Sequence, residues 1–98
     1  MEIKFQWDDK KNVINQKKHG VSFEDAAVVF KDPKRLEMLD KKHSLFEDRW
    51  TMVGLNSATI LRVSFTERNN SIRIISARKA DQKEEEKYLY GYSTFYIK

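Results

Sequence analysis

Apolar and polar residues alternate along three stretches in the second half of the chain. Residues 49–55, 59–67 and 72–78 carry apolar side chains at nearly every second position, which is the period of a β-strand buried on one face. Polar segments at 56–58 and 68–71 separate the three stretches and predict turns. The pattern therefore predicts three consecutive antiparallel strands with one apolar face and one polar face.

The first half of the chain predicts a short strand followed by two helices. Residues 2–7 alternate, and residues 8–20 begin with two aspartates and end in Lys-Lys-His-Gly, which suits the two ends of a helix dipole. A second helix begins at Ser22 and ends before Pro33, which cannot extend it.

The remaining segments predict a strand over 35–39, a polar loop over 40–48 and a last helix over 80–92 capped by Asp81. In that helix Glu84–Glu86 are expected on a solvated exterior, with Tyr88 or Leu89 turned inward. We expect an α+β fold in one domain over residues 1–98, in which the three helices pack on the apolar face of an antiparallel sheet. The tail over 91–98 receives no assignment.

Strand register decides which charges share a face. A two-residue turn at Asn56-Ser57 would pair Leu55 with Ala58. A three-residue loop after Arg68 would pair Arg62 with Arg78, whereas a two-residue loop would turn Arg78 into the apolar face. We therefore expect the longer loop. It places these side chains on the polar face: Arg49, Thr51, Arg62, Ser64, Thr66, Arg68, Ser76 and Arg78.

The same register has two further consequences. Ile75 and Ala77 should face the helices, and Arg73 should oppose Glu67 in an edge ion pair rather than join the polar face. Arg62 and Arg78 should face each other, and such like-charged pairs repel. A bound phosphate would relieve the repulsion, because guanidinium groups match its oxygens. Neutralisation by Glu47, Asp48 or the last helix is the alternative.

The amino-acid composition limits the kinds of partner and the location expected for the protein. The 98 residues carry a formal charge of +4, which favours nucleic acid or an acidic protein as partner. The chain has no cysteine and no apolar run of membrane-spanning length, so we expect a soluble cytoplasmic protein. His19 suits a helix C-terminus and His43 a solvated loop. Two distant histidines predict neither a metal site nor a cofactor.

Four segments together resemble the BrnT toxins of bacterial type II toxin–antitoxin systems. They are "KHGVSFEDAAVVFKDP" at 18–33, "EDRW" at 47–50 with Gly54 beyond it, "TERNNSIRIISARKA" at 66–80, and Glu86 with Tyr88. The resemblance implies a RelE-like fold and a ribonuclease whose RNA lies on the sheet face opposite the helices. It also implies a BrnA-like antitoxin with a ribbon-helix-helix part, which forms a hetero-oligomer with the toxin and carries it to operator DNA.

Site residues follow from the motifs and from strand pairing. The motifs suggest His19, Arg68 and Arg78 for catalysis, and Lys18, Arg73 and Lys79 for RNA binding. Strand pairing adds Arg62 to the first group and Arg49 to the second.

The expected reaction is metal-independent attack of the ribose 2′-hydroxyl on the adjacent phosphate, with arginines stabilising the phosphorane charge. His19 is the expected general base, and Glu47 or Glu67 is the alternative. Two other functions remain open: a non-catalytic module that binds nucleic acid or an acidic peptide, and a silent subunit that only supports an antitoxin's DNA binding.

Overall fold

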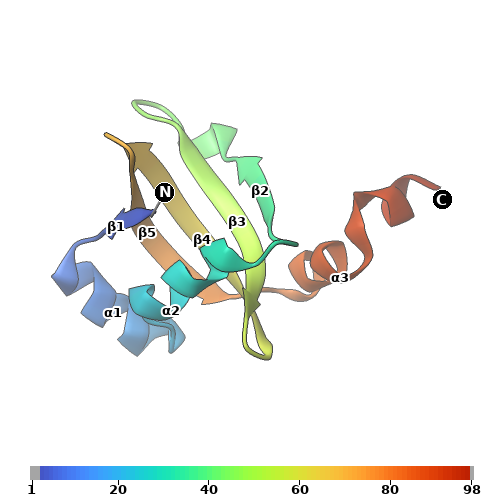
Figure 1. Ribbon diagram of the computed structural model, residues 1–98, viewed down its shortest axis with the longest axis horizontal. Helices are drawn as coiled ribbons and strands as arrows, with labels where there is room; N and C mark the ends of the chain where they lie inside the picture. The colour runs from blue at the N-terminus through green and yellow to red at the C-terminus, as the bar shows by residue number, and fades with distance from the viewer. Residues whose placement is uncertain (1–2, 98) are drawn as a thin grey trace.

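Five strands form one mixed sheet in the order β1-β5-β4-β3-β2 (Figure 1). This computed structural model describes the backbone of residues 3–97 and the side chains of residues 3–91. The strands are β1 (Lys4–Gln6), β2 (Leu36–Leu39), β3 (Arg49–Asn56), β4 (Thr59–Arg68) and β5 (Ser71–Lys79). Strands β2 to β5 are antiparallel as predicted. The edge strand β1 runs parallel to β5, so the prediction of a wholly antiparallel sheet was wrong. No hairpin joins these two strands, so no turn constrains their relative direction.

The helices lie where their capping residues predict them. They are α1 (Asp9–His19), α2 (Phe23–Val28) with the 3₁₀ turn η1 (Val29–Lys31), η2 (Lys41–His43), and α3 (Gln82–Ile97). Asp8 and Ser22 accept hydrogen bonds from the first turns of α1 and α2, and Gly20 ends α1 in the left-handed conformation. Gly91, with a φ of 75°, interrupts α3. Among residues 3–97, no helix has the length and apolar content needed to cross a membrane.

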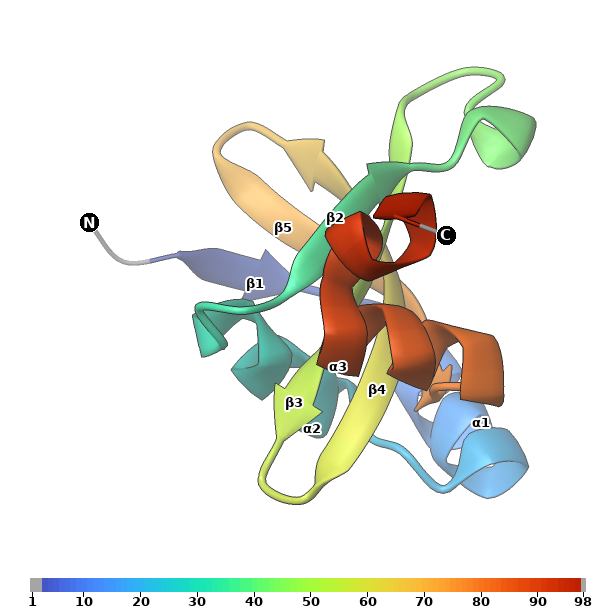
Figure 2. The ribbon, with the colours of Figure 1, turned by 90° about the vertical axis from the view of Figure 1, so that its right-hand side faces the viewer.

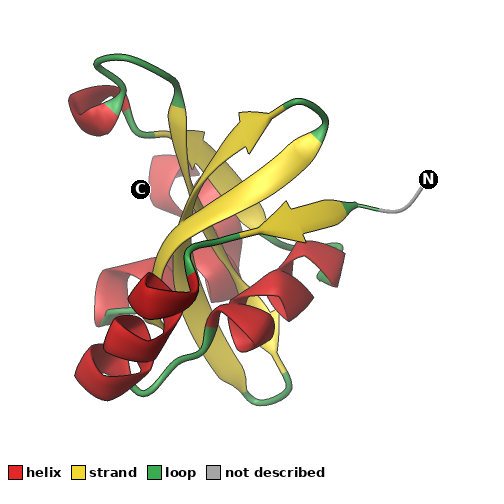
Figure 3. Ribbon diagram, turned by 90° about the vertical axis from the view of Figure 1, so that its left-hand side faces the viewer, coloured by secondary structure: helices red, strands yellow, loops and turns green. Residues whose placement is uncertain are grey.

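Helices α1 and α2 lie on one face of the sheet, where the core forms (Figure 3). Phe23, Ala26, Val29 and Phe30 of α2 and η1 are buried in one cluster with the apolar side chains of β3, β4 and β5. The ring of Phe30 meets Phe5 edge-on at 5.1 Å and Phe65 at 4.9 Å between centroids. The apolar face therefore carries the core, as the alternation predicts.

Asparagines, rather than apolar side chains, form the buried side of α1. The side chain of Asn15 donates to the carbonyls of Val21 and Ala77 and accepts from the amide of Ala77. Asn12 accepts from the amide of Phe23, at 2.8 Å. Asn15 thus takes the place of a neighbouring strand beside β5, beyond the residues that pair with β1.

Helix α3 lies on the opposite face of the sheet from α1 and α2, so the prediction of three helices on one face was wrong (Figure 2). Val53 points to the polar face of β3, yet it is buried. An apolar side chain on that face needs a cover, and α3 packs against β3. The polar face is therefore open only in part.

The β3–β4 hairpin keeps the predicted faces with different partners. Its two-residue loop is Ser57-Ala58, so Asn56 pairs with Thr59 and Met52 pairs with Val63. The predicted pairing of Leu55 with Ala58 was wrong by two residues. Because side chains alternate with period two, this shift leaves every residue on its predicted face.

A β-bulge in β5 allows the predicted strand pairing to form with a shorter β4–β5 loop than predicted. The loop is Asn69-Asn70, and both residues have positive φ, as a type I′ turn requires. The predicted three-residue loop was therefore wrong. An extra residue in β5, beside Ser64 and Phe65, then restores the predicted pairs Ser64–Ser76 and Arg62–Arg78.

The bulge also reassigns three side chains between Ile72 and Ser76. Ile74 is buried in the core, whereas Ile75 lines a cavity on the polar face, the reverse of the prediction for Ile75. Arg73 pairs with Thr66 and thus lies on the polar face. The predicted ion pair between Arg73 and Glu67 was wrong, because Glu67 opposes Ile72.

Candidate functional site

The polar face of the sheet carries three rows of side chains that cross β3, β4 and β5. The strand pairing aligns them as Val53–Arg62–Arg78, Thr51–Ser64–Ser76 and Arg49–Thr66–Arg73. Neighbouring strands are about 4.8 Å apart, and successive rows are about 7 Å apart along a strand. A row of hydroxyl groups is thus flanked by two rows that each contain two arginines.

The carboxylate of Glu84 neutralises the first arginine pair. Its two oxygens accept from Arg78 Nη1 at 2.9 Å and Nη2 at 3.1 Å, and Arg62 Nε lies 3.1 Å from Oε2. The side chain of Glu84 is 19% exposed. The anion expected between these facing arginines is therefore supplied by the last helix, which is the alternative raised from the sequence. The prediction that Glu84 lies on a solvated exterior was wrong.

Glu84 also caps α3. The amide of Asp81 donates to Glu84 Oε1, and the amide of Glu84 donates to Asp81 Oδ1, both at 2.9 Å. This reciprocal pair is a capping box with aspartate at the N-cap, as the sequence predicts for Asp81. One carboxylate therefore fixes the start of α3 and attaches it to the sheet.

Tyr88 gives α3 a second attachment. Its hydroxyl donates to Asp32 Oδ2, which also accepts from the amide of Leu55 at 2.8 Å. Burial, together with this bond, raises the pKa of Tyr88 to about 12. The tyrosine is therefore a neutral hydrogen-bond donor, and Asp32 joins α3 to the end of β3.

Replacing Glu84 with alanine should destabilise the protein by about 2 kcal/mol, because it removes a helix cap and leaves two facing arginines without their anion. For a chain of this size that corresponds to a fall in Tm of about 10 °C. Glu85→Ala, one residue further along and exposed, is the matched control and should leave Tm nearly unchanged. Equal Tm values for the two variants, measured by circular dichroism, would contradict this structural role.

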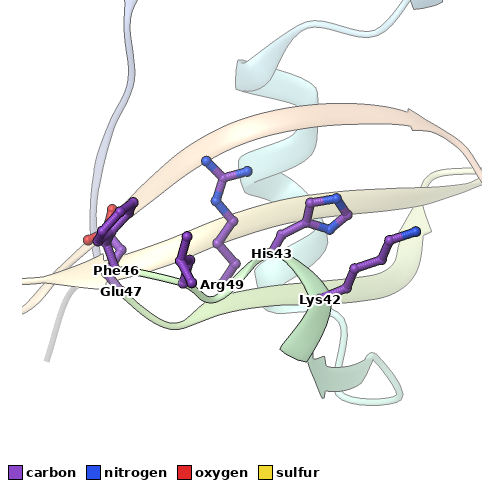
Figure 4. A pocket seen from close by; sticks show the side chains of 6 residues that line it. Lys42, His43, Phe46, Glu47 and Arg49 are labelled. Atoms are coloured by element: carbon purple, nitrogen blue, oxygen red, sulfur yellow. The ribbon is translucent and has the colours of Figure 1, made fainter.

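A second cluster lies next to the first on the polar face, around His43, and shares Arg62 with it. A cavity of about 220 Å³ is lined by side chains from the segment before β3 and from the three central strands: Asp40, His43, Arg49, Arg62, Ser64, Ile75 and Ser76. His43 Nδ1 is 2.9 Å from Asp40 Oδ2. In Figure 4, His43 projects from η2 and Arg49 from the start of β3. The residues around the cavity thus include a histidine, two arginines and two serines.

Asp40 fixes the protonation pattern of the His43 ring. Burial raises the pKa of Asp40, but hydrogen bonds and the nearby charge of His43 outweigh it, so the pKa lies below its ordinary value. A carboxylate only accepts hydrogen bonds, so Nδ1 of His43 carries a proton and donates to it. Nε2 is then the nitrogen left to accept or deliver a proton.

The segment before β3 is held in place at both ends. Ser44 Oγ donates to the carbonyl of Asp40 at 2.5 Å and accepts from the amide of Arg49 at 2.9 Å. Glu47 binds the guanidinium of Arg68 through both of its oxygens. The hydrogen bonds from Arg68 hold the pKa of Glu47 below its ordinary value. Arg68 therefore holds this segment against β4.

The residues suggested from the sequence fall into two groups. Arg49, Arg62, Arg73 and Arg78 share the polar face, and Arg68 follows at the end of β4. Lys18, His19 and Lys79 do not join them. Lys18 and His19 end α1, and Lys79 pairs with Leu61 of the apolar face and lines a cavity with Gly20. His19 is thus separated by the sheet from the arginines that it was expected to assist.

His43, its partner Asp40, and Glu84 are residues of the polar face for which the sequence indicated no functional role. The signal for His43 was the spacing in "DKKH", because Asp40 and His43 are three residues apart and meet across one 3₁₀ turn. Glu84 was visible only as the third residue after the predicted cap. Among the described residues, no group of three or more histidine, cysteine or acidic side chains is placed to hold a metal ion.

Guanidinium groups match the oxygens of a phosphate, and a histidine oriented by a carboxylate can act as a general base, so this face has the groups needed to bind and cleave a phosphodiester. A family model described as "Ribonuclease toxin, BrnT, of type II toxin-antitoxin system" matches residues 7–84. The chain belongs to this family, whose members are ribonuclease toxins that act within toxin–antitoxin pairs. A search of curated proteins finds no match.

Proposed function

We propose that the protein cleaves RNA on the polar face of its sheet without a metal ion, with the ribose 2′-hydroxyl as the nucleophile. The observation that carries this proposal is the Asp40–His43 pair, which opens into the same cavity as Arg49 and Arg62. A base and cationic groups around one cavity are what this reaction needs. The part of the sheet face that α3 leaves open, opposite α1 and α2, supports a RelE-like arrangement for RNA binding.

His43 acts as general base in this proposal, in place of His19. Its Nε2 takes the proton from the 2′-hydroxyl, and the 2′ oxygen forms a bond to phosphorus. The bond from phosphorus to the 5′ oxygen then breaks, and the imidazolium returns the proton to that oxygen. The products are a 2′,3′-cyclic phosphate and a 5′-hydroxyl end. Asp40 stabilises the imidazolium and keeps the ring in the required orientation.

Arg62 and Arg49 stabilise the charge that develops on the phosphorane oxygens. Arg62 reaches Glu84 through Nε, and it is also one of the residues that line the cavity. Arg78 binds Glu84 through both Nη atoms, so we assign it a positioning role, holding Glu84 and thereby Arg62. Ser64 and Ser76 supply hydroxyl donors for the non-bridging oxygens. Arg73, at the far end of the neighbouring row, extends the positive surface along the RNA backbone.

Cleavage should persist in EDTA, because side chains rather than a bound ion supply the positive charge in this mechanism. The test incubates purified protein with 5′-labelled single-stranded RNA and analyses the new ends. The expected product ends in a 2′,3′-cyclic phosphate, and RNA methylated at every 2′ oxygen should remain intact. Complete loss of cleavage in EDTA with recovery in Mg²⁺, or a free 3′-hydroxyl product, would disprove the mechanism. Binding without any cleavage would favour a non-catalytic module.

The cognate partner in this proposal is a BrnA-like antitoxin with a ribbon-helix-helix part, and the complex binds operator DNA through that part. Membership of a type II family supports an antitoxin partner. Expression of the toxin alone should arrest growth, and co-expression of the antitoxin encoded beside it should relieve the arrest. Unchanged growth in the first case would favour the silent-subunit alternative.

A further inference from the structure

The segment between η2 and β3 exposes two large apolar side chains. Leu45 is 82% exposed and Phe46 is 96% exposed. This exposure does not come from a loose segment, because Ser44 closes its base and Glu47 binds Arg68 directly beside Phe46. A phenyl ring held in solvent at a fixed position has unfavourable contact with water, which a planar ligand would remove.

This ring borders a cavity that continues from the proposed catalytic one. The cavity has a volume of about 380 Å³ and is lined by Lys42, His43, Leu45, Phe46, Glu47 and Arg49. His43 and Arg49 line both cavities. In Figure 4, Arg49 stands between Phe46 with Glu47 on one side and His43 with Lys42 on the other. A group bound here would thus lie directly beside the phosphate that His43 and Arg49 contact in the proposed mechanism.

The lining selects for a group that is both flat and anionic. Lys42 and Arg49 contribute positive charge, while the carboxylate of Glu47 is already bound to Arg68. A nucleotide of single-stranded RNA combines a planar base with a phosphate, and bases stack on aromatic side chains in such sites. The volume also lies in the range of about 300–1,000 Å³ that is usual for small-ligand sites.

We propose that this cavity is a base-binding subsite, in which Phe46 stacks on a base next to the cleaved phosphodiester and Lys42 with Arg49 hold its phosphate. The subsite rests on the proposed function, since it places the RNA relative to His43. It makes Phe46 a positioning residue for the substrate, and stacking accepts any base, so it favours single-stranded over paired RNA.

The test measures binding of a fully 2′-O-methylated single-stranded oligonucleotide, which lacks the nucleophile and therefore reports binding alone. Phe46→Ala should weaken binding roughly 5- to 150-fold, the usual range for loss of one stacked base. Phe46→Leu, which keeps an apolar side chain but has no ring, should weaken it similarly. Phe46→Trp should bind like the parent, and its added indole fluorescence should be quenched by the oligonucleotide. In cleavage assays, Phe46→Ala should raise KM and leave kcat nearly unchanged.

Several outcomes would overturn the subsite. Parent-like binding by Phe46→Ala would show that the ring does not contact RNA, and parent-like binding by Phe46→Leu alone would exclude stacking. If Phe46→Ala lost the antitoxin but kept the oligonucleotide, the ring would belong to the antitoxin interface. Because the binding assay needs no cleavage, failure of His43 as the base would leave this result unaffected. Thermal unfolding of each variant should match the parent, since Phe46 packs on nothing that stabilises the fold.

Discussion

His43→Ala should lower the rate of RNA cleavage by a factor of about 10²–10⁴, the usual contribution of one general base. The imidazole is the group in the polar-face cavity that is oriented to take up a proton, because Asp40 accepts from its Nδ1 at 2.9 Å. The measurement is single-turnover cleavage of a labelled RNA at saturating protein. Binding of the 2′-O-methylated oligonucleotide should change little, so the loss should appear in the chemical step.

His19→Ala is the matched control, because it removes the other histidine of the chain. His19 ends α1 on the far side of the sheet from the cavity, so its loss should leave cleavage within a few-fold of the parent. A His43→Ala protein as active as the parent would contradict the role of His43 as general base. An inactive His19→Ala protein would support His19 as the base instead. Asp40→Asn should give an intermediate loss, because it weakens the orientation of the ring without removing the base.

Arg62→Ala should reduce cleavage by a factor of about 10²–10³, the usual cost of losing one group that stabilises developing negative charge. Arg62 lines the cavity and is held by Glu84, so its guanidinium is already positioned before RNA binds. The loss should appear mainly in kcat, because the charge on the phosphorane exists only in the transition state. Arg62→Lys should recover only part of the activity, since lysine lacks the planar fork.

Lys79→Ala controls for the loss of positive charge in that experiment. Lys79 lies on the neighbouring strand, but it pairs with Leu61 on the apolar face. Both variants lose one positive charge, so an effect of net charge alone would weaken RNA binding equally in the two proteins. Equal rates for Arg62→Ala and Lys79→Ala would remove Arg62 from the mechanism. Thermal unfolding of both proteins must be compared, since Arg62 also contacts Glu84.

The bulge in β5 explains why the sequence predicted the faces of the sheet well at one end and poorly at the other. Alternation from Ser76 to Arg78 matches alternation in β4, so the common face of Arg62 and Arg78 was predictable from period two alone. Their direct pairing was predicted from a three-residue loop, and the bulge restores that pairing with a two-residue loop. Near the turn, the sequence allowed either a three-residue loop or a two-residue loop that would place the charge of Arg78 in the core. The chain uses a two-residue loop and inserts an extra residue, an option that the pattern of apolar positions does not reveal.

The position of α3 shows a second feature that the sequence does not predict. Residues 80–92 are predicted to form a helix, and Asp81 predicts where it begins. These residues do not predict which face the helix covers, because both faces of the sheet offer it a partner. Helix α3 is held on the polar face because Glu84 binds Arg62 and Arg78 and because Tyr88 binds Asp32. Of these contacts, those of Glu84 with Arg62 and of Tyr88 with Asp32 join residues that are distant in sequence.

The sequence by itself determined the strands, the helix caps, the two-faced sheet and the family, because these depend on local propensity, alternation and motif order. Only the tertiary structure decided which arginines can bind a ligand and which histidine lies beside them. His19 belongs to the most recognisable motif, yet the sheet separates it from the arginines, while His43 of an unremarkable loop joins Arg49 and Arg62. The physical reason is that a catalytic group acts over hydrogen-bond distances, and such distances between strands and loops are set by packing rather than by position along the chain.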